Sequence, residues 1–290
     1  MSAEDELAKL ERQVLKAASI GSYLKRVDTL RQLLERASPD IVALVLAMRS
    51  PRVEAQALAA VLDAFGVGAR DALSILEESG QLDAIGRIGR PSAEARANVR
   101  GLDKAGREAL ATAQKLARAG ADAQAVTAPL IGYANAVQRR VTYAVNQAGN
   151  EGSTAIADAA GIPTVWVAEF NACRHCLAYS GRVTSPGKKF PGGLTYGSKG
   201  LNTGPLKHPP LHPHCRCTVE PLRSKEYASA LRREADRSVL RGFSLESESM
   251  GVRIDAAQRL LGRNPDAPKT VVQYAERAVK RGKFTTRGRP

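Results

Sequence analysis

The sequence has few aromatic side chains and no long hydrophobic run. Aromatic residues make up 4% of the 290 residues, whereas hydrophobic residues make up 43%, so the apolar content is mainly Ala, Leu and Val. This composition favours helices that pack closely through small side chains. A run of about 18 apolar residues, which a membrane span needs, does not occur. The acidic start lacks the apolar segment of a signal peptide, so we expect a protein of the reducing cytoplasm.

Acidic side chains are scarce in the C-terminal part of the chain. The formal net charge is +14; residues 1–170 contain 20 basic and 20 acidic side chains, whereas residues 171–290 contain 23 and 9. A positive excess confined to one part of a chain predicts attraction to a polyanion, usually nucleic acid. We expect phosphate contacts with double-stranded DNA and no sequence readout. The candidate residues are Lys188, Lys189, Lys199, Lys207, Lys280, Arg281, Lys283, Arg287 and Arg289.

The N-terminal part has helical periodicity and no residues typical of a chemical site. Residues 1–80 repeat apolar side chains at helical spacing, and they contain no Cys, no His and no Gly-rich phosphate loop. We expect Gly66 to end one helix and Ala69–Glu78 to form the next. Residues 80–100 have the Gly and Pro punctuation of a connector. We therefore predict that residues 1–100 are a helical region that docks on other proteins, followed by a connector.

Helical patterns continue on both sides of the cysteine-containing segment. Asp103–Arg118 and Ala123–Ala148 are predicted helices, and Gly149 with Gly152 is expected to interrupt the second pattern. After residue 222 we expect three more helices and then a basic, disordered tail. These segments are Lys225–Leu240, Arg253–Leu261, Ala267–Arg281 and the tail, residues 280–290. Residues 223–290 are therefore predicted to be a helical, basic C-terminal region.

All four cysteines and all four histidines of the chain lie between Cys173 and Cys217. Cys173 and Cys176 have the spacing that presents two sulfurs to one metal ion, because the backbone between them curls around it. His212 and Cys215 repeat that spacing. Cys215 and Cys217 are two positions apart, so both can face the same side of an extended segment. The shared chemistry that this pattern indicates is one tetrahedral zinc ion.

Five ligand candidates compete for the four positions around such an ion. The favoured set is Cys173, Cys176 and His212 with Cys215 or Cys217, of which Cys215 is narrowly preferred; His175, His208 and His214 are outside candidates. A disulfide is an alternative for the thiols, whereas a catalytic cysteine would be a single reactive thiol beside a base. Four protein ligands leave no open position, so the zinc would be structural. It would contribute folding energy to the Gly- and Lys-rich loop between Cys176 and His212.

The hydrophobic period changes in front of the cysteines. Thr164–Phe170 has the β-branched and aromatic residues of a strand, Thr218–Pro221 is its expected partner, and Gly181–Thr184 is a third candidate. A small sheet built from these strands would hold the two ends of the cysteine–histidine segment together. We predict a mainly α fold, in which a helical N-terminal region precedes a small α+β domain, residues 101–222, with a short β-sheet and a zinc-stapled loop.

The second half of the cysteine–histidine segment resembles the phage Mu protein F-like head-morphogenesis family. The matching residues are Pro209, Pro210, His212, Pro213, Cys215, Arg216, Cys217 and Thr218, preceded by the Cys173 and Cys176 pair and Gly181. The polar helix upstream, with Arg139, Arg140 and residues 146–152, resembles the family's helix before its strand, and Trp166 stands where members often have Trp. The resemblance covers residues 125–222. Two departures are His214, where Asn is common, and the lack of an Asp before the cysteine pair, where Glu169 or Asn171 stands instead.

Members of this family are minor head proteins of tailed bacteriophages, and the resemblance implies the same class for this chain. It implies a protein of the virion, in the capsid interior or at the portal vertex, that passes through the host cytoplasm during assembly. It further implies contacts with the portal protein and other capsid components, a homo-oligomer around the portal, and no membrane partner. The expected role is in head assembly and in DNA packaging or delivery, which agrees with the basic C-terminal part.

A metal-dependent nuclease is the alternative function. His208, His212 or His214 would then act on DNA, with a carboxylate or Asn near a free histidine to hold a second metal ion. No acidic residue occurs between Glu169 and Glu220, so we predict that the chain is not an enzyme. A regulator that binds a specific DNA sequence would need a recognition helix with its turn, and the sequence has no convincing pattern of that kind.

Overall fold

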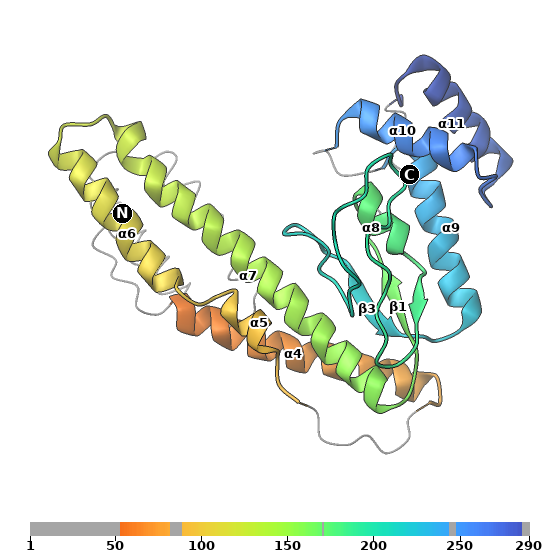
Figure 1. Cartoon of the computed structure of the whole chain (residues 1–290), viewed down its shortest axis with the longest axis horizontal. Coiled ribbons are helices and arrows are strands. Elements are labelled where there is room, and N and C mark those ends of the chain that lie inside the picture. Colours follow the sequence, from red (N-terminus) through yellow and green to blue (C-terminus); the bar gives the residue numbers. More distant parts are fainter. Residues whose placement is uncertain (1–52, 82–88, 170, 244–247, 286–290) are drawn as a thin grey trace, which may run out of the picture. The chain divides into compact units, whose positions relative to one another are not determined.

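The described part of the chain is mainly helical with a small sheet, as the sequence predicted. The computed structural model describes residues 53–81, 89–169, 171–243 and 248–285 (Figure 1). Its helices are α4 (Val53–Glu78), α5 (Ala93–Ala97), α6 (Leu102–Arg118), α7 (Ala123–Ala159), α8 (Arg174–Tyr179), α9 (Lys225–Arg241), α10 (Met250–Leu261) and α11 (Lys269–Arg281), and its strands are β1 (Thr164–Val167), β2 (Val183–Thr184) and β3 (Thr218–Pro221). The helices predicted within residues 1–50 lie outside the described residues. None of the described helices is both long and apolar enough to cross a membrane.

The chain forms two compact units that are interleaved along the sequence. Of the described residues, one unit comprises those within 53–64 together with Pro91–Val145, and the other comprises those within 65–90 and 146–285. The sequence predicted three consecutive regions instead, with boundaries after residues 100 and 222. The two divisions differ because the long helices α4 and α7 each contribute residues to both units.

The first unit contains buried hydrophobic clusters and a turn after α5 whose carbonyl groups accept hydrogen bonds from an arginine of α7. One of its clusters of buried residues comprises Ala113, Val126 and Leu130, from α6 and α7. Arg140 of α7 donates hydrogen bonds to the carbonyl oxygens of Asn98 (2.8 Å) and Arg100 (2.6 Å). These carbonyls follow the end of α5, where a helix has no further turn to donate N–H groups to them. The arginine that the family resemblance singled out beside Arg139 is therefore engaged with backbone.

Glycines let α4 and α7 approach each other closely in the second unit. The prediction that Gly66, Gly149 and Gly152 break helices was wrong, because both helices continue through them. A Cβ atom on Gly68 would lie 1.9 Å from the Gly149 carbonyl oxygen, and one on Gly152 would lie 2.1 Å from the Phe65 carbonyl oxygen. The missing side chains therefore permit a close backbone approach and do not end the helices. The residues packed beside this crossing are Ala69, Ala72, Leu76 and Ile156.

The three predicted strands form one antiparallel sheet in the order β2-β1-β3. The central strand β1 pairs with β2 at Val165↔Val183 and with β3 at Trp166↔Val219. Val165 and Trp166 are both fully buried, and because neighbouring residues of a strand point to opposite faces, both faces of the sheet are covered. The predicted locations of all three strands are confirmed. The sheet places the segment before Cys173 beside the segment after Cys217.

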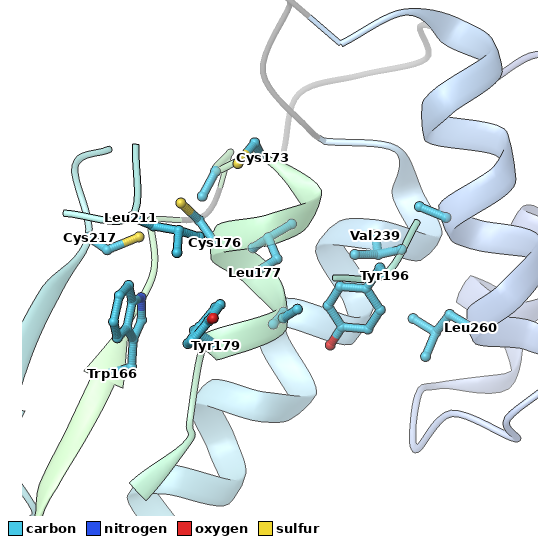
Figure 2. Packing of buried hydrophobic residues seen from close by; sticks show 14 of the residues in the cluster. Trp166, Cys173, Cys176, Leu177, Tyr179, Tyr196, Leu211, Cys217, Val239 and Leu260 are labelled. Atoms are coloured by element: carbon cyan, nitrogen blue, oxygen red, sulfur yellow. The ribbon is translucent and has the colours of Figure 1, made fainter. Parts of the chain in front are cut away.

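One hydrophobic core joins the cysteine-containing segment to the C-terminal helices. The rings of Trp166 and Tyr179 lie 4.7 Å apart between centroids, and Phe190 meets Trp166 edge-on at 5.3 Å. Helix α9 packs on α8, and α9, α10 and α11 pack on one another. The labelled members of this cluster in Figure 2 are Trp166, Cys173, Cys176, Leu177, Tyr179, Tyr196, Leu211, Cys217, Val239 and Leu260. Residues on both sides of position 222 therefore belong to one continuous core.

The first residues of the C-terminal tail are folded, so the predicted disorder is wrong for this part. Helix α11 includes Lys280 and Arg281, and the side chain of Phe284 is only 7% exposed. Phe284 fills the space beside Gly242, which ends α9 in the left-handed conformation. The Tyr274 hydroxyl donates to the carbonyl oxygen of the following residue, Thr285 (2.9 Å). Residues 286–290 of the tail lie outside the described residues.

Replacing either of two glycines of α4 with alanine should have opposite effects on the stability of the protein. A Cβ atom on Gly66 meets only the flexible end of Arg70, at 3.5 Å, so we expect Gly66→Ala to stabilise the protein by about 0.5–1 kcal/mol through helix propensity. Gly68→Ala places its methyl group against rigid backbone, and we expect a destabilisation of about 1–3 kcal/mol. Thermal or denaturant unfolding of both variants measures the difference. Equal stability of the two variants would show that the close helix crossing does not exist.

Candidate metal centre

The first two cysteines are positioned by the beginning of α8, a helix that the sequence analysis did not predict. Cys173 immediately precedes the helix with an extended backbone (φ −67°, ψ 162°), and its thiol makes no capping hydrogen bond. The Leu177 amide donates to the Cys173 carbonyl oxygen (2.9 Å), which closes the first turn around Cys176. Figure 2 shows the sulfurs of Cys173, Cys176 and Cys217 gathered at one end of the hydrophobic core.

The other ligand candidates come from a tight turn that leads into β3. The Cys215 amide donates to the His212 carbonyl oxygen (2.9 Å), so the chain turns back between these two residues. Cys217 directly precedes the first residue of β3. Its place in the fold is therefore set by the pairing of β3 with β1, whereas that of Cys215 is set by the turn.

A row of polar side chains on α7 fixes the backbone around Cys217. Asn150 accepts a hydrogen bond from the Val219 amide (2.6 Å) and donates to the Cys217 carbonyl oxygen (3.3 Å). Asn146 donates to the same Cys217 oxygen (3.1 Å), and Ser153 donates to the Val219 carbonyl oxygen (2.8 Å). Because β3 is an edge strand, these groups have no strand partner, and α7 satisfies them. This role was not predicted from the sequence, although its signal is present as polar residues at helical spacing in a helix rich in Ala and Val.

Five ligand atoms converge between α8 and the turn. His212 Nε2 lies 3.2 Å from Cys173 Sγ and 3.1 Å from Cys176 Sγ, and Cys176 Sγ lies 3.7 Å from Cys215 Sγ. The atoms form two overlapping groups, within each of which all ligand atoms lie within 4.8 Å of one another. One group is Cys173, Cys176 and His212, and the other is Cys176, Cys215 and Cys217. The structure therefore brings all five predicted ligands together, with Cys176 common to both groups.

The four thiols are free and buried, and this limits the negative charge that they can hold. None is more than 7% exposed. A hydrogen bond with Cys176 lowers the pKa of Cys173 to about 4 and that of Cys215 to about 3. The hydrogen bond with Cys173, followed by those with Cys215 and Cys217, raises the pKa of Cys176. Protons are therefore shared among the sulfurs, because neighbouring buried thiolates repel one another. A bound divalent cation removes this limit.

A buried indole N–H also faces the cluster. Trp166 is fully buried, and its Nε1 atom has no nitrogen or oxygen acceptor among the described residues, so the Cys217 sulfur is the acceptor that it meets. Since Trp166 lies opposite Val219, Cys217 points to the same side of the sheet as the indole ring. Figure 2 shows the nitrogen-bearing edge of the ring on the side of Cys217. A charged thiolate centre would offer this buried donor a stronger acceptor than neutral thiols do.

The arrangement fits a tetrahedral metal ion. With metal–sulfur distances of about 2.3 Å and metal–nitrogen distances of about 2.0 Å, two sulfur ligands lie about 3.8 Å apart, and a sulfur and a nitrogen ligand about 3.5 Å apart. The separation of 3.7 Å between Cys176 and Cys215 matches the first value. The separations of 3.1 and 3.2 Å from His212 are slightly shorter than the second. The cluster can therefore hold a metal ion.

The remaining histidines lie outside the two ligand groups. His175 is buried in α8, and burial, followed by the charge of Arg174, lowers its pKa. His208 is engaged by the neighbouring carbonyl of Pro209, 2.7 Å from its Nδ1. His214 is exposed and lines the small pocket that the cysteines also line.

Arg216 connects the motif to the segment before Cys173. Its guanidinium lies 2.7 Å from the Glu169 carboxylate and donates to the Asn171 side-chain oxygen (3.1 Å). These are the two residues that stand in place of the Asp before the cysteine pair. Because the Arg216 and Glu169 side chains are 49% and 46% exposed, the pair contributes no more than about 1 kcal/mol. Its effect is to orient the two halves of the site.

The loop between Cys176 and His212 has packing of its own, although it is rich in Gly and Lys. Phe190 is fully buried, Tyr196 is 2% exposed, and the Phe190 amide donates to the Leu206 carbonyl oxygen (2.7 Å). Carboxylates outside the loop fix its backbone. Asp158 accepts a hydrogen bond from the Gly187 amide (2.8 Å), and Asp255 accepts one from the Ser198 amide (2.9 Å). The loop is therefore held in place by its own packing and hydrogen bonds, and not by metal binding alone, as its composition had suggested.

The predicted DNA-contact residues are exposed wherever the structure describes them. They are Lys188, Lys189, Lys199, Lys207, Lys280, Arg281 and Lys283, whereas Arg287 and Arg289 lie outside the described residues. Lys207 Nζ lies 3.9 Å from a carboxylate oxygen of Asp158, so its charge is partly engaged. The described candidates for DNA contact belong to two separate segments, the loop between Cys176 and His212 and the end of α11 with the residues that follow it.

Comparisons of the chain with protein-family models, with curated proteins and with solved structures found no match. The phage-family resemblance of the cysteine–histidine segment therefore stays a prediction. What the fold itself contributes is the convergence of the predicted ligands and the capacity of the cluster to bind a metal.

The shared position of Cys176 predicts which substitution removes the metal. Because Cys176 belongs to both ligand groups, we expect Cys176→Ala to lose the bound divalent metal completely. His214→Ala is the matched control, since it changes an exposed histidine of the same motif, and this variant should keep the metal of the parent protein. Elemental analysis after purification, together with Co²⁺ absorption spectra, measures both. Full metal occupancy in Cys176→Ala would rule out this site.

Proposed function

We propose that the chain is a structural minor head protein of a tailed phage, of the Mu protein F-like head-morphogenesis class. It holds one structural zinc ion, associates with the portal, and acts in head assembly and in DNA packaging or delivery. The observation that carries the proposal concerns the motif behind the resemblance. Its residues His212, Cys215 and Cys217 supply ligand atoms to the cluster, and Arg216 contacts the segment before the first cysteine.

Zinc is the metal that this set of donors favours. Thiolate and imidazole ligands suit Zn²⁺, whereas Mg²⁺ and Ca²⁺ prefer carboxylate and carbonyl oxygens. Neither ligand group contains a carboxylate. Three ligands are Cys173, Cys176 and His212, and Cys215 or Cys217 is the fourth. Four protein ligands leave no open coordination position, which supports a structural ion.

The same features weigh against the nuclease alternative. A hydrolytic metal site needs an open position for water, commonly with carboxylate ligands. Within the part of the chain that the structure describes, the groups able to hold a metal both lie at the cysteine cluster. Glu169, the acid that lines the neighbouring pocket, is paired with Arg216. We therefore assign the function of the protein to its surfaces, which the metal centre would hold in place, and not to chemistry at the metal.

Charge supports a position next to packaged DNA. The positive excess lies entirely in residues 171–290, and the described lysines of the loop and of α11 are exposed. Such cations contact phosphates without reading the sequence. Residues 1–170, which carry no net charge, would dock on the portal protein. In the virion the protein would form a homo-oligomer around the portal.

The location of the protein in purified phage particles tests this proposal. We expect a few copies in each particle, found by quantitative mass spectrometry, and antibody label at the portal vertex in electron micrographs. Phage that carry Cys176→Ala should assemble defective heads, whereas His214→Ala phage should assemble as the parent does. A protein that is abundant in infected cells but absent from purified particles would exclude the proposed function.

A further inference from the structure

We propose that the exposed face of α11 is the surface that docks on the phosphate backbone of double-stranded nucleic acid. This inference rests on the proposed contact with DNA and assigns that contact to one helix. The face consists of Lys269, Gln273, Arg277, Lys280 and Arg281, all of which are exposed. Two of these residues, Lys269 and Arg277, were not among the candidates predicted from the sequence.

The periodicity of α11 places these cations together. Positions 269, 273, 277, 280 and 281 follow helical spacing, so they share one side of the helix. The opposite side carries Val271, Ala275 and Ala278, which are buried in the core. At 1.5 Å of rise per residue, the cations cover about 18 Å along the helix axis. Duplex DNA carries about one charge per 1.7 Å of its own axis, so several phosphates lie within reach of such a face.

The charges of this face are not neutralised by the rest of the described chain. None of its four cations has an acidic partner within ion-pair distance among the described residues, and Glu276 is the one acid beside them on the exposed side of the helix. Two exposed cations elsewhere are engaged: Arg259 lies 2.9 Å from Asp255, and Lys207 lies 3.9 Å from an Asp158 oxygen. Unpaired cations on one helix face keep their full attraction for an external anion.

The face is held rigidly, which lowers the entropy lost on binding. Helix α11 packs on α9 and α10. The segment after it is anchored by Phe284, whose ring stacks on Tyr274 with a centroid separation of 6.2 Å and lies 5.7 Å from the Arg253 guanidinium. Lys283 is therefore presented beside α11 as a fifth exposed cation. A preorganised row of charges binds more tightly than the same charges on a flexible tail.

The composition of the face selects the partner. It has no exposed apolar residue, which a helix lying on a membrane surface needs. It also has no free aromatic ring on which unpaired bases could stack, because Tyr274 packs on Phe284 and its hydroxyl donates to the Thr285 carbonyl oxygen. Aromatic anchors of a protein–protein contact are missing for the same reason. A surface that presents four cations and Gln273 beside a single acid, Glu276, suits the phosphates of a duplex.

Salt-dependent binding of the full-length protein to a short DNA duplex of random sequence tests the inference. The test variant combines Lys269→Gln, Arg277→Gln, Lys280→Gln and Arg281→Gln, and glutamine preserves helix propensity. The control combines Lys104→Gln, Arg107→Gln, Lys115→Gln and Arg118→Gln on α6, where all four cations are exposed. Both variants remove the same net charge. Circular dichroism establishes that both are folded.

We expect the α11 variant to bind at least about tenfold more weakly at moderate salt. The slope of log K against log[salt] should become shallower by about 0.9 for each phosphate that the variant no longer neutralises. The α6 control should keep the affinity and slope of the parent. If the parent binds DNA and the α11 variant binds equally well, or if the control is weakened as much, the inference is overturned while the proposed binding of DNA stands. If the parent does not bind even at low salt, the proposed binding of DNA is itself overturned.

Discussion

Four buried thiols and one imidazole meet between α8 and the turn before β3, and the charge that these groups can hold together constrains the site. Hydrogen bonds with Cys173, Cys215 and Cys217 raise the pKa of Cys176, because neighbouring buried thiolates repel one another. A divalent metal would let the thiols ionise together and would join two segments that are about 40 residues apart along the chain. With a bound metal ion the cluster would cross-link the helix that follows β1 and the strand that pairs with it.

The metal centre is framed by contacts that have no metal chemistry of their own. Asn150 bonds both the Val219 amide and the Cys217 carbonyl, so a helix of more than thirty residues covers the open edge of the sheet. That helix is in turn held against α4 by the close approach at Gly68 and Gly149. The order of the site therefore extends through backbone packing to residues far from any ligand. Burial of Phe190 completes the frame from the side of the loop.

The sequence predicted the ligands and strands well because each has a short-range signal. The Cys-x-x-Cys spacing, the β-branched run at Thr164 and the turn from His212 to Cys215 are all local patterns. The errors arose where the meaning of a residue depends on a distant partner. Gly149 and Gly152 looked like helix breaks, but they serve a helix crossing, and Phe284 looked like part of a free tail, but it is buried beside Gly242. The α7 amides and the α11 face likewise needed tertiary placement to acquire a role.

The metal content of the protein, purified without added metal, tests the central claim most directly. The account predicts about one zinc ion per chain by elemental analysis. It also predicts that a strong chelator releases the ion, frees the cysteine thiols for titration and changes the fluorescence of Trp166, the only tryptophan of the chain. A folded protein with no bound metal and four freely titrating thiols would contradict the claim that a metal ion joins the two halves of the site.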